Sequence, residues 1–159
     1  MATYKTPQGG VIIVFSVLFA MLLMLLPLPE TLRFVRPEWV IMVLIYWAMA
    51  LPNRVGVGFA WVVGLLIDVM MGGTLGVLAF AYALVIYLVL GFHLQLRQYP
   101  LWQQALSIMS LVLLVHIIAV LISPRTASWH VWLPAVTSTI MWPFVYGTLR
   151  KLRRTLKVS

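Results

Sequence analysis

The sequence contains no cysteine and very few acidic residues. Its 159 residues include three Asp or Glu against eleven Lys or Arg, and 9% are charged, whereas a soluble domain has roughly 25%. The lack of cysteine excludes disulfides, thiol catalysis and thiolate metal sites. Hydrophobic residues make up 64% of the chain, in continuous runs rather than the alternation of an outer-membrane barrel. We therefore predict an all-α integral membrane protein, with residues 1–159 forming a single transmembrane domain.

The formal net charge of +8 has two interpretations, nucleic-acid binding and membrane topology. The basic residues stand singly between the apolar runs or in one terminal cluster, which is how topology is encoded in membrane proteins. A nucleic-acid surface would gather them on one face. We expect no nucleic-acid partner.

Six apolar runs predict about six transmembrane helices. Two of them, 39–51 and 55–71, are short. A helix of about 13 residues reaches about 20 Å, against about 30 Å of hydrocarbon. These two either span while shielded by longer neighbours, or form a broken hairpin that enters the membrane. The predicted spans are 10–26, 39–51, 55–71, 74–92, 101–122 and 131–148, and a basic tail follows at 149–159.

The basic residues orient these spans. With the N-terminus inside, eight basic residues lie in inner segments and three in outer segments, so the positive-inside rule predicts that both termini are cytoplasmic. The outer residues are Arg33, Arg36 and Arg125, and the inner ones are Lys5, Arg54, Arg97, Arg150, Lys151, Arg153, Arg154 and Lys157.

Asp68 is the only acidic residue inside an apolar run. A carboxylate in hydrocarbon costs roughly 2.5–3.5 kcal/mol, so we expect it to have a partner or a role. It could accept hydrogen bonds from backbone N–H groups across 72–74, where the next helix starts, or it could pair with Arg33 or Arg36. The functional alternatives are a proton site, a ligand site and a regulatory contact.

Asp68 also belongs to a row of small residues spaced four apart. Up to Met71 such positions lie on one ridge of a helix, and small residues there let a second helix approach closely. The row predicts a packing surface, used either within the chain or for a partner helix. Its members are Gly56, Ala60, Gly64, Asp68, Gly72 and Gly76.

The basic tail is a stop signal for membrane insertion. Because Leu149, Leu152 and Leu156 share one helical face, the tail could also lie on the inner leaflet. We predict contact with anionic lipid or with an acidic cytoplasmic partner. The residues concerned are Arg150, Lys151, Arg153, Arg154 and Lys157.

Catalysis has little support in the sequence. There is no paired-carboxylate site, no phosphate loop and no metal cluster, so we expect no catalytic, cofactor or metal site. His116 lacks a second histidine or a carboxylate at helical spacing, and we expect it to be a neutral, hydrogen-bonded packing residue. Trp47 and Trp61 lie deep in their runs, and we expect both to pack in the interior.

An ordered set of motifs covers nearly the whole chain. It resembles the bacterial rod-shape-determining protein family MreD, and the last two motifs resemble its proteobacterial members. The motifs are RPEWV (36–40), YWAMALPNRV (46–55), GLLID (64–68), GGTLGV (72–77), LWQQAL (101–106) and the ending Trp142-Pro143 to Arg150-Lys151.

The resemblance implies a non-catalytic inner-membrane component of the cell-elongation machinery. Such proteins work with the bitopic protein MreC, the actin-like MreB, the glycosyltransferase RodA and an elongation-specific transpeptidase. The family also resembles, more distantly, the six-helix substrate-binding subunits of energy-coupling-factor transporters. Its aspartate–glycine pattern falls on Asp68, Gly72 and Gly76, and the first motif contains Arg36 and Pro37. These are candidate structural or interaction positions without an assigned chemistry.

Two functional hypotheses follow. In the first, the protein is a scaffold that docks the transmembrane helix of MreC on the row of small residues and helps to position peptidoglycan synthases, with a homo-oligomer also open. In the second, it is a small-molecule or lipid-binding transport subunit with a polar pocket around Asp68, open to the outside. The scarcity of polar residues favours the scaffold.

Overall fold

The computed structural model describes residues 9–124 and 129–157. Lys5 and Arg125, used in the charge count, and the last two residues of the tail lie outside the described residues. The regular structure within them is helical. Its elements are α1 (Gly10–Leu25), α2 (Glu30–Arg33), α3 (Trp39–Ala50), α4 (Val57–Met71), α5 (Val77–Gln98), α6 (Leu101–Ile122), the 3-10 helix η2 (Trp129–Trp132) and α7 (Leu133–Thr155).

Six helices, α1 and α3 to α7, occupy the six apolar runs. Proline marks two boundaries. α3 ends at Ala50 ahead of Pro52, because proline disfavours helix in the residue before it. α6 begins directly after Pro100, because proline is tolerated where a helix starts. Two helices extend past the predicted runs. α5 continues to Gln98, and α7 continues to Thr155. Most of the basic tail is therefore the last turns of a long helix rather than a separate segment.

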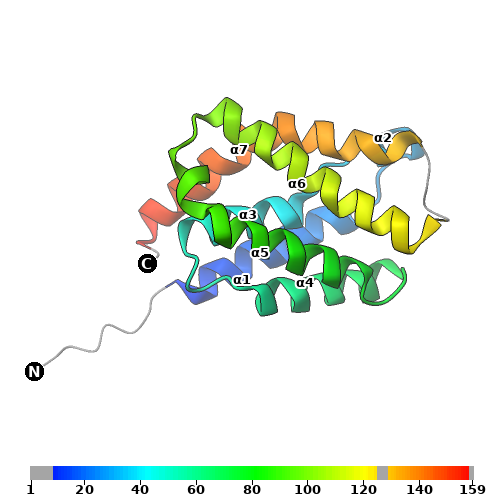
Figure 1. Ribbon diagram of the computed structural model, residues 1–159, viewed down its shortest axis with the longest axis horizontal. Coiled ribbons are helices and arrows are strands. Elements are labelled where there is room, and N and C mark those ends of the chain that lie inside the picture. The colour runs from blue at the N-terminus through cyan, green and yellow to red at the C-terminus, as the bar shows by residue number, and fades with distance from the viewer. Residues whose placement is uncertain (1–8, 125–128, 158–159) are drawn as a thin grey trace, which may run out of the picture.

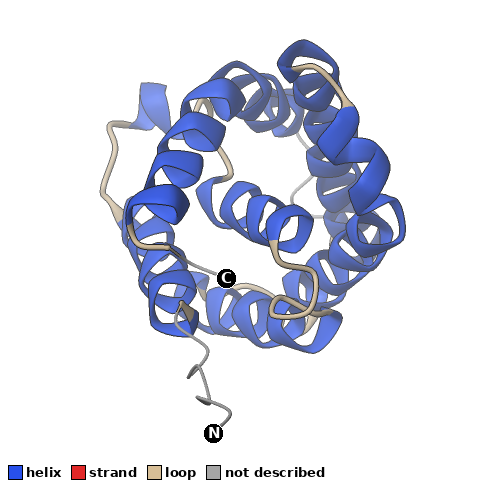
Figure 2. Cartoon of the chain, turned by 90° about the vertical axis from the view of Figure 1, so that its left-hand side faces the viewer, coloured by secondary structure: helices blue, strands red, loops and turns tan. Residues whose placement is uncertain are grey.

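The short helix α3 lies at the centre of the bundle. Its side chains are buried from Val40 to Met49, as expected of a helix that is apolar on every face. Figure 2, which looks along the bundle, shows one helix enclosed by a ring of others, and α1, α5 and α7 pack directly on α3. Its length is about 18 Å. α3 is thus shielded by its neighbours, as the first alternative requires, while its spanning of the membrane stays a prediction.

The remaining helices build the wall around α3. α4 packs against α5, α5 against α6, and α6 against α7. The beginning of α1 and the end of α7 lie at one end of the bundle, while α2 lies at the other (Figure 1). Trp47 of α3 is buried and donates its indole Nε1–H to Ser16 Oγ of α1 at 2.9 Å, which fixes α1 on the central helix.

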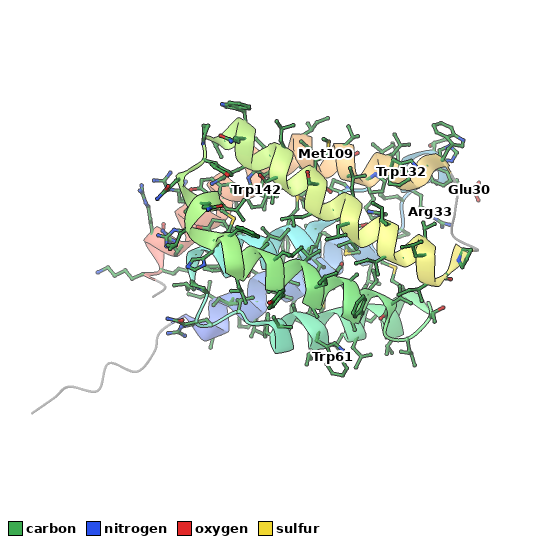
Figure 3. The ribbon with its side chains drawn as sticks, in the orientation of Figure 1. Glu30, Arg33, Trp61, Met109, Trp132 and Trp142 are labelled. Atoms are coloured by element: carbon green, nitrogen blue, oxygen red, sulfur yellow. The ribbon has the colours of Figure 1, made fainter. Side chains whose placement is uncertain are left out.

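The outer surface of the bundle is apolar. α5 and α6 are long and apolar enough to cross a membrane, with 22 residues each and mean hydropathies of 2.3 and 2.8, and α1, α3 and α4 are shorter apolar helices. Exposed side chains such as Phe15 and Leu121 suit contact with lipid. The expectation that Trp61 packs inside is wrong: it is 47% exposed and points away from the bundle (Figure 3).

Candidate functional site

Asp68 caps the start of the next helix. It lies one turn before the end of α4 and is 3% exposed. Its Oδ2 accepts hydrogen bonds from the backbone N–H groups of Gly76 at 2.9 Å and Ala79 at 3.3 Å, and its Oδ1 accepts from Leu78 N–H at 3.2 Å. The N-cap residue Gly76 has no side chain for this purpose. The carboxylate therefore satisfies the free N–H groups of α5 and faces the positive end of its dipole.

Two glycines make this connection possible. Gly72 has φ 66° and Gly76 has φ 92°, in the left-handed region that glycine adopts readily. Gly73 N–H bonds to the backbone carbonyl of Asp68 at 3.2 Å, which closes the end of α4. Asp68 thus has two roles: its backbone carbonyl accepts a hydrogen bond at the end of α4, and its carboxylate caps the start of α5. The aspartate–glycine pattern is explained by this tight connection.

The row of small residues faces α5 of the same chain at its centre. Ala60 and Gly64 are buried. A Cβ added at Gly64 would come within 2.7 Å of both Ala79 Cα and the Leu78 carbonyl oxygen, so α4 and α5 approach as closely there as glycine allows. At Gly56, by contrast, a Cβ would meet nothing within 4 Å. A partner helix would have to displace α5 to use the middle of the row.

Arg36 caps a different helix, so the suggested Asp68–Arg36 pair is not formed. The guanidinium Nη1 and Nη2 of Arg36 donate to the carbonyls of Met24 and Leu26, at the end of α1. A cation at a helix C-terminus is favourable for the same reason that an anion is favourable at an N-terminus. Pro37 follows Arg36, and its carbonyl accepts from Trp39 N–H at 3.0 Å as α3 begins.

The structure also shows an ionisable pair that sequence reasoning did not find. His116 Nε2 of α6 lies 3.4 Å from Glu38 Oε1, and Glu38 N–H donates to Ser138 Oγ of α7 at 2.9 Å. These contacts tie the start of α3 to α6 and α7. The expectation of a neutral packing histidine is therefore corrected to one that faces a carboxylate. Helical spacing could not reveal the pair, because the two residues lie on different helices.

The tautomer of His116 follows from its second contact. His116 Nδ1 lies 2.9 Å from the carbonyl oxygen of Val112, which can only accept, so Nδ1 carries a proton. His116 Nε2 faces the Glu38 carboxylate, so the ring bridges α6 and the start of α3.

Asp68 and His116 line a cavity of about 400 Å³, called here the Asp68 cavity. It lies at the end of the bundle that holds α2, where Figure 3 shows Glu30, Arg33 and Trp132. The ring of His130 stacks on Phe34 with a centroid distance of 4.4 Å, which joins η2 to the segment after α2. The polar residues among its lining are Arg33, Asp68, Thr74, His116, Ser123 and His130. The cavity offers both cationic and anionic groups to a small molecule, while Asp68 already accepts three backbone hydrogen bonds.

The basic residues of the tail take two different places on α7. Arg150 and Arg153 line a second cavity together with Arg97 of α5. Lys151, Arg154 and Lys157 are exposed. The leucine face formed by Leu149, Leu152 and Leu156 lines a groove between α7 and α1. Leu149 is buried and Leu156 is 47% exposed; contact of the tail with the inner leaflet stays a prediction.

Comparison with known proteins decides the family. A family profile described as "rod shape-determining protein MreD" matches residues 6–152. The chain belongs to the MreD family. It is also 35% identical to the rod shape-determining protein MreD of Haemophilus influenzae over 162 residues, which cover 99% of each chain. No solved structure matches the chain, so the likeness to transporter subunits stays a prediction.

Membership confirms the resemblance found in the ordered motifs. MreD proteins are inner-membrane proteins of rod-shape determination and are not known as enzymes. The apolar exterior of the helical bundle agrees with that setting. Asp68, Gly72 and Gly76 build the connection from α4 to α5, and they lie within the range that the family profile matches.

Proposed function

We propose that the protein is a non-catalytic membrane scaffold of the cell-elongation machinery. It docks the transmembrane helix of MreC and helps to position peptidoglycan synthases. RodA, the elongation transpeptidase and MreB are further partners, bound directly or indirectly. Membership of the MreD family over nearly the whole chain supports this setting. The observation that carries the docking step is an apolar groove on the membrane-facing side of the bundle.

This α1–α7 groove has a volume of about 450 Å³. Its walls are α1 and α7, and its floor includes Trp39 and Val43 of the central helix. Phe15, Phe19 and Phe144 stand at its edges with 67%, 63% and 66% of their surface exposed. Its lining residues are Ile12, Phe15, Ser16, Phe19, Ala20, Leu23, Trp39, Val43, Phe144, Val145, Thr148, Leu149, Leu152 and Leu156.

The groove fits an apolar transmembrane helix better than it fits a soluble ligand. Helices in lipid associate through close packing, because lipid is as apolar as their side chains. A concave surface between two helices gives a third helix far more contact than a flat face does. Since α5 fills the middle of the row of small residues, we place the MreC helix in the α1–α7 groove instead of on that row.

The proposed orientation keeps both termini in the cytoplasm. α1 and the five helices α3 to α7 alternate in direction, which brings the start of α1 and the end of α7 to the same end of the bundle (Figure 1). Arg97, Arg150 and Arg153 line a cavity together with the end of α3. Asp68 and Glu38 belong to the opposite end, where α3 begins. This distribution supports the positive-inside assignment.

Co-purification from native membranes tests the docking surface. We expect the double variant Phe19→Ala/Phe144→Ala, at the edges of the groove, to lower the recovery of MreC about tenfold, because two large contact side chains are lost. The matched control is Phe80→Ala/Leu121→Ala, since these residues on α5 and α6 are comparably exposed. Equal recovery of MreC with the groove variant and the control would refute docking in the groove.

A second candidate function, a small-molecule or lipid-binding transport subunit, rests on the Asp68 cavity. Its volume of about 400 Å³ lies within the range of roughly 300–1,000 Å³ usual for ligand sites. Ala119→Trp would fill this cavity from α6. A ligand held by the wild type in native mass spectrometry and lost in this variant would support transport. Normal MreC recovery with no ligand in either protein would support the scaffold.

A further inference from the structure

A second cavity, called here the arginine cavity, lies beyond the end of α3. Its volume is about 190 Å³, against about 30 Å³ for one water molecule in the liquid. α3 is shorter than the helices around it and leaves this space at its C-terminal end. Three arginines from two other helices converge on it. The lining residues are Tyr46, Met49, Ala50, Arg97, Tyr146, Arg150 and Arg153.

The charge of this cavity is not balanced by the described residues. Its lining contains three guanidinium groups and no carboxylate. The three Asp and Glu residues of the chain lie elsewhere: Glu30 is at the opposite end of the bundle (Figure 3), Glu38 faces His116 and Asp68 caps α5. Three like charges facing one small space repel one another unless an anion joins them.

The donors of these arginines are also free. Among residues 9–124 and 129–157, Arg97, Arg150 and Arg153 take part in neither an ion pair nor a side-chain hydrogen bond. Each guanidinium carries five N–H donors in a planar fork. The fork matches two oxygens of a phosphate group, which is why arginine is favoured wherever phosphate is bound.

Two tyrosines form one side of the cavity. Tyr46 of α3 and Tyr146 of α7 meet edge to face, with ring centroids 5.6 Å apart and an interplanar angle of 78°. Tyr146 also contacts the buried ring of Trp142 at 6.0 Å. Ring packing of this kind fixes both tyrosines, and their hydroxyls add two further donors to the lining. The cavity is a concave site at the surface: Arg153 is half-buried in it, and the exposed Arg97 and Arg150 lie at its edge.

We propose that the arginine cavity binds the phosphate group of an anionic membrane lipid. The bundle is membrane-embedded, and this cavity is at the end of the central helix, where phosphate headgroups of the leaflet are available. A compact anion such as a phosphate group fits its volume. The inference goes beyond the docking of MreC and does not depend on the α1–α7 groove.

A matched pair of variants tests this site. In the cavity variant, Arg97, Arg150 and Arg153 are all changed to Gln. In the control, Lys151, Arg154 and Lys157 are changed to Gln, which removes the same number of charges from the same end of the bundle but leaves the cavity lining intact. Each protein is reconstituted in nanodiscs of phosphatidylcholine with a minor fraction of phosphatidylglycerol. The lipid retained after mild release is counted by native mass spectrometry.

We expect the cavity variant to lose retained phosphatidylglycerol by about tenfold or more, because three charge-assisted contacts disappear together. The control should keep it. Equal loss from both variants would show diffuse attraction to the tail and would overturn the proposal. Circular dichroism and gel filtration confirm that each variant is folded, and Tyr146→Phe, which keeps the ring and removes one donor, should give a smaller loss of the same sign.

Two further arms separate the sources of the anion. Inorganic phosphate is added at millimolar concentration to the wild type: lipid retained despite it supports a lipid site, whereas full displacement indicates a site for free phosphate and overturns the lipid assignment. Co-purification from cells forms the other arm. If the cavity variant keeps its lipid but loses a cytoplasmic protein, the arginines serve a protein partner and the proposal is wrong.

Discussion

Replacing Asp68 removes the cap of α5, and the structure allows the cost to be worked out. The carboxylate accepts hydrogen bonds from three N–H groups. Hydrogen bonds to a charged group contribute about 1.5–3 kcal/mol each, but water from the adjoining cavity replaces part of this when the side chain is cut back. Loss of an N-cap costs about 0.5–2 kcal/mol. We expect Asp68→Ala to lower the free energy of unfolding by about 3 kcal/mol in total.

Thermal unfolding in mild detergent measures this effect. For a chain of this size, 1 kcal/mol corresponds to a shift in Tm of roughly 2–4 °C, so Asp68→Ala should lower Tm by about 6–12 °C. Asp68→Asn keeps the size and one acceptor oxygen, and we expect about half of that loss. Arg33→Gln, in the same cavity, should change stability by less than about 0.5 kcal/mol.

The double variant of Asp68 and Arg33 decides between a helix cap and an ion pair. If Asp68 serves α5, the effects of the two substitutions add, with a coupling below about 0.5 kcal/mol. A larger coupling, or a Tm loss from Arg33→Gln as great as that from Asp68→Ala, would refute the capping role and restore the pairing considered from the sequence.

Three other predictions concern the packing of the bundle. Gly64→Ala places a Cβ within 2.7 Å of α5 backbone atoms and should lower the free energy of unfolding by about 3 kcal/mol. The control Gly58→Ala, on the same helix, meets nothing within 4 Å and should be neutral or stabilising by up to about 1 kcal/mol. Equal Tm values for the two variants would contradict this. Ser138→Ala leaves Glu38 N–H without its acceptor, at a cost of about 1 kcal/mol, and an unchanged Tm would count against that bond. Gln104 is 2% exposed and bonds to the Leu96 carbonyl, so Gln104→Leu should cost about 1–3 kcal/mol in the same assay.

The sequence predicted six of the helices well, because each corresponds to an apolar run, whereas α2 and η2 were not predicted. The predicted run 39–51 ends within one residue of the end of α3, and the run 101–122 coincides with α6. The sequence left open whether the short runs span while shielded by longer neighbours or form a broken hairpin, and it did not place α3 at the centre of the bundle. Periodicity cannot show which neighbours enclose a helix, and the exposed Trp61 shows the same limit, since lipid and protein interior favour the same side chains.

The candidate site was predicted in part. The sequence singled out Asp68, Gly72 and Gly76, and acceptance of backbone N–H groups was one of the alternatives raised for Asp68. The donors lie a few residues beyond the predicted 72–74, because α5 begins only at Val77. Contacts between helices far apart in sequence, such as His116 with Glu38, were not predictable from spacing. The arginine cavity was missed for the same reason, since Arg97 reads as a single loop residue.

Site-specific crosslinking tests the central claim, the docking of MreC in the α1–α7 groove, most directly. The chain has no cysteine, so Phe15→Cys, Phe144→Cys and Trp61→Cys each introduce a unique thiol. They are paired in native membranes with a cysteine moved along the MreC transmembrane helix. We expect crosslinks from Phe15→Cys and Phe144→Cys, repeating every three to four residues along the partner, and none from Trp61→Cys. Crosslinks from Trp61→Cys, or none from the groove positions, would contradict the account.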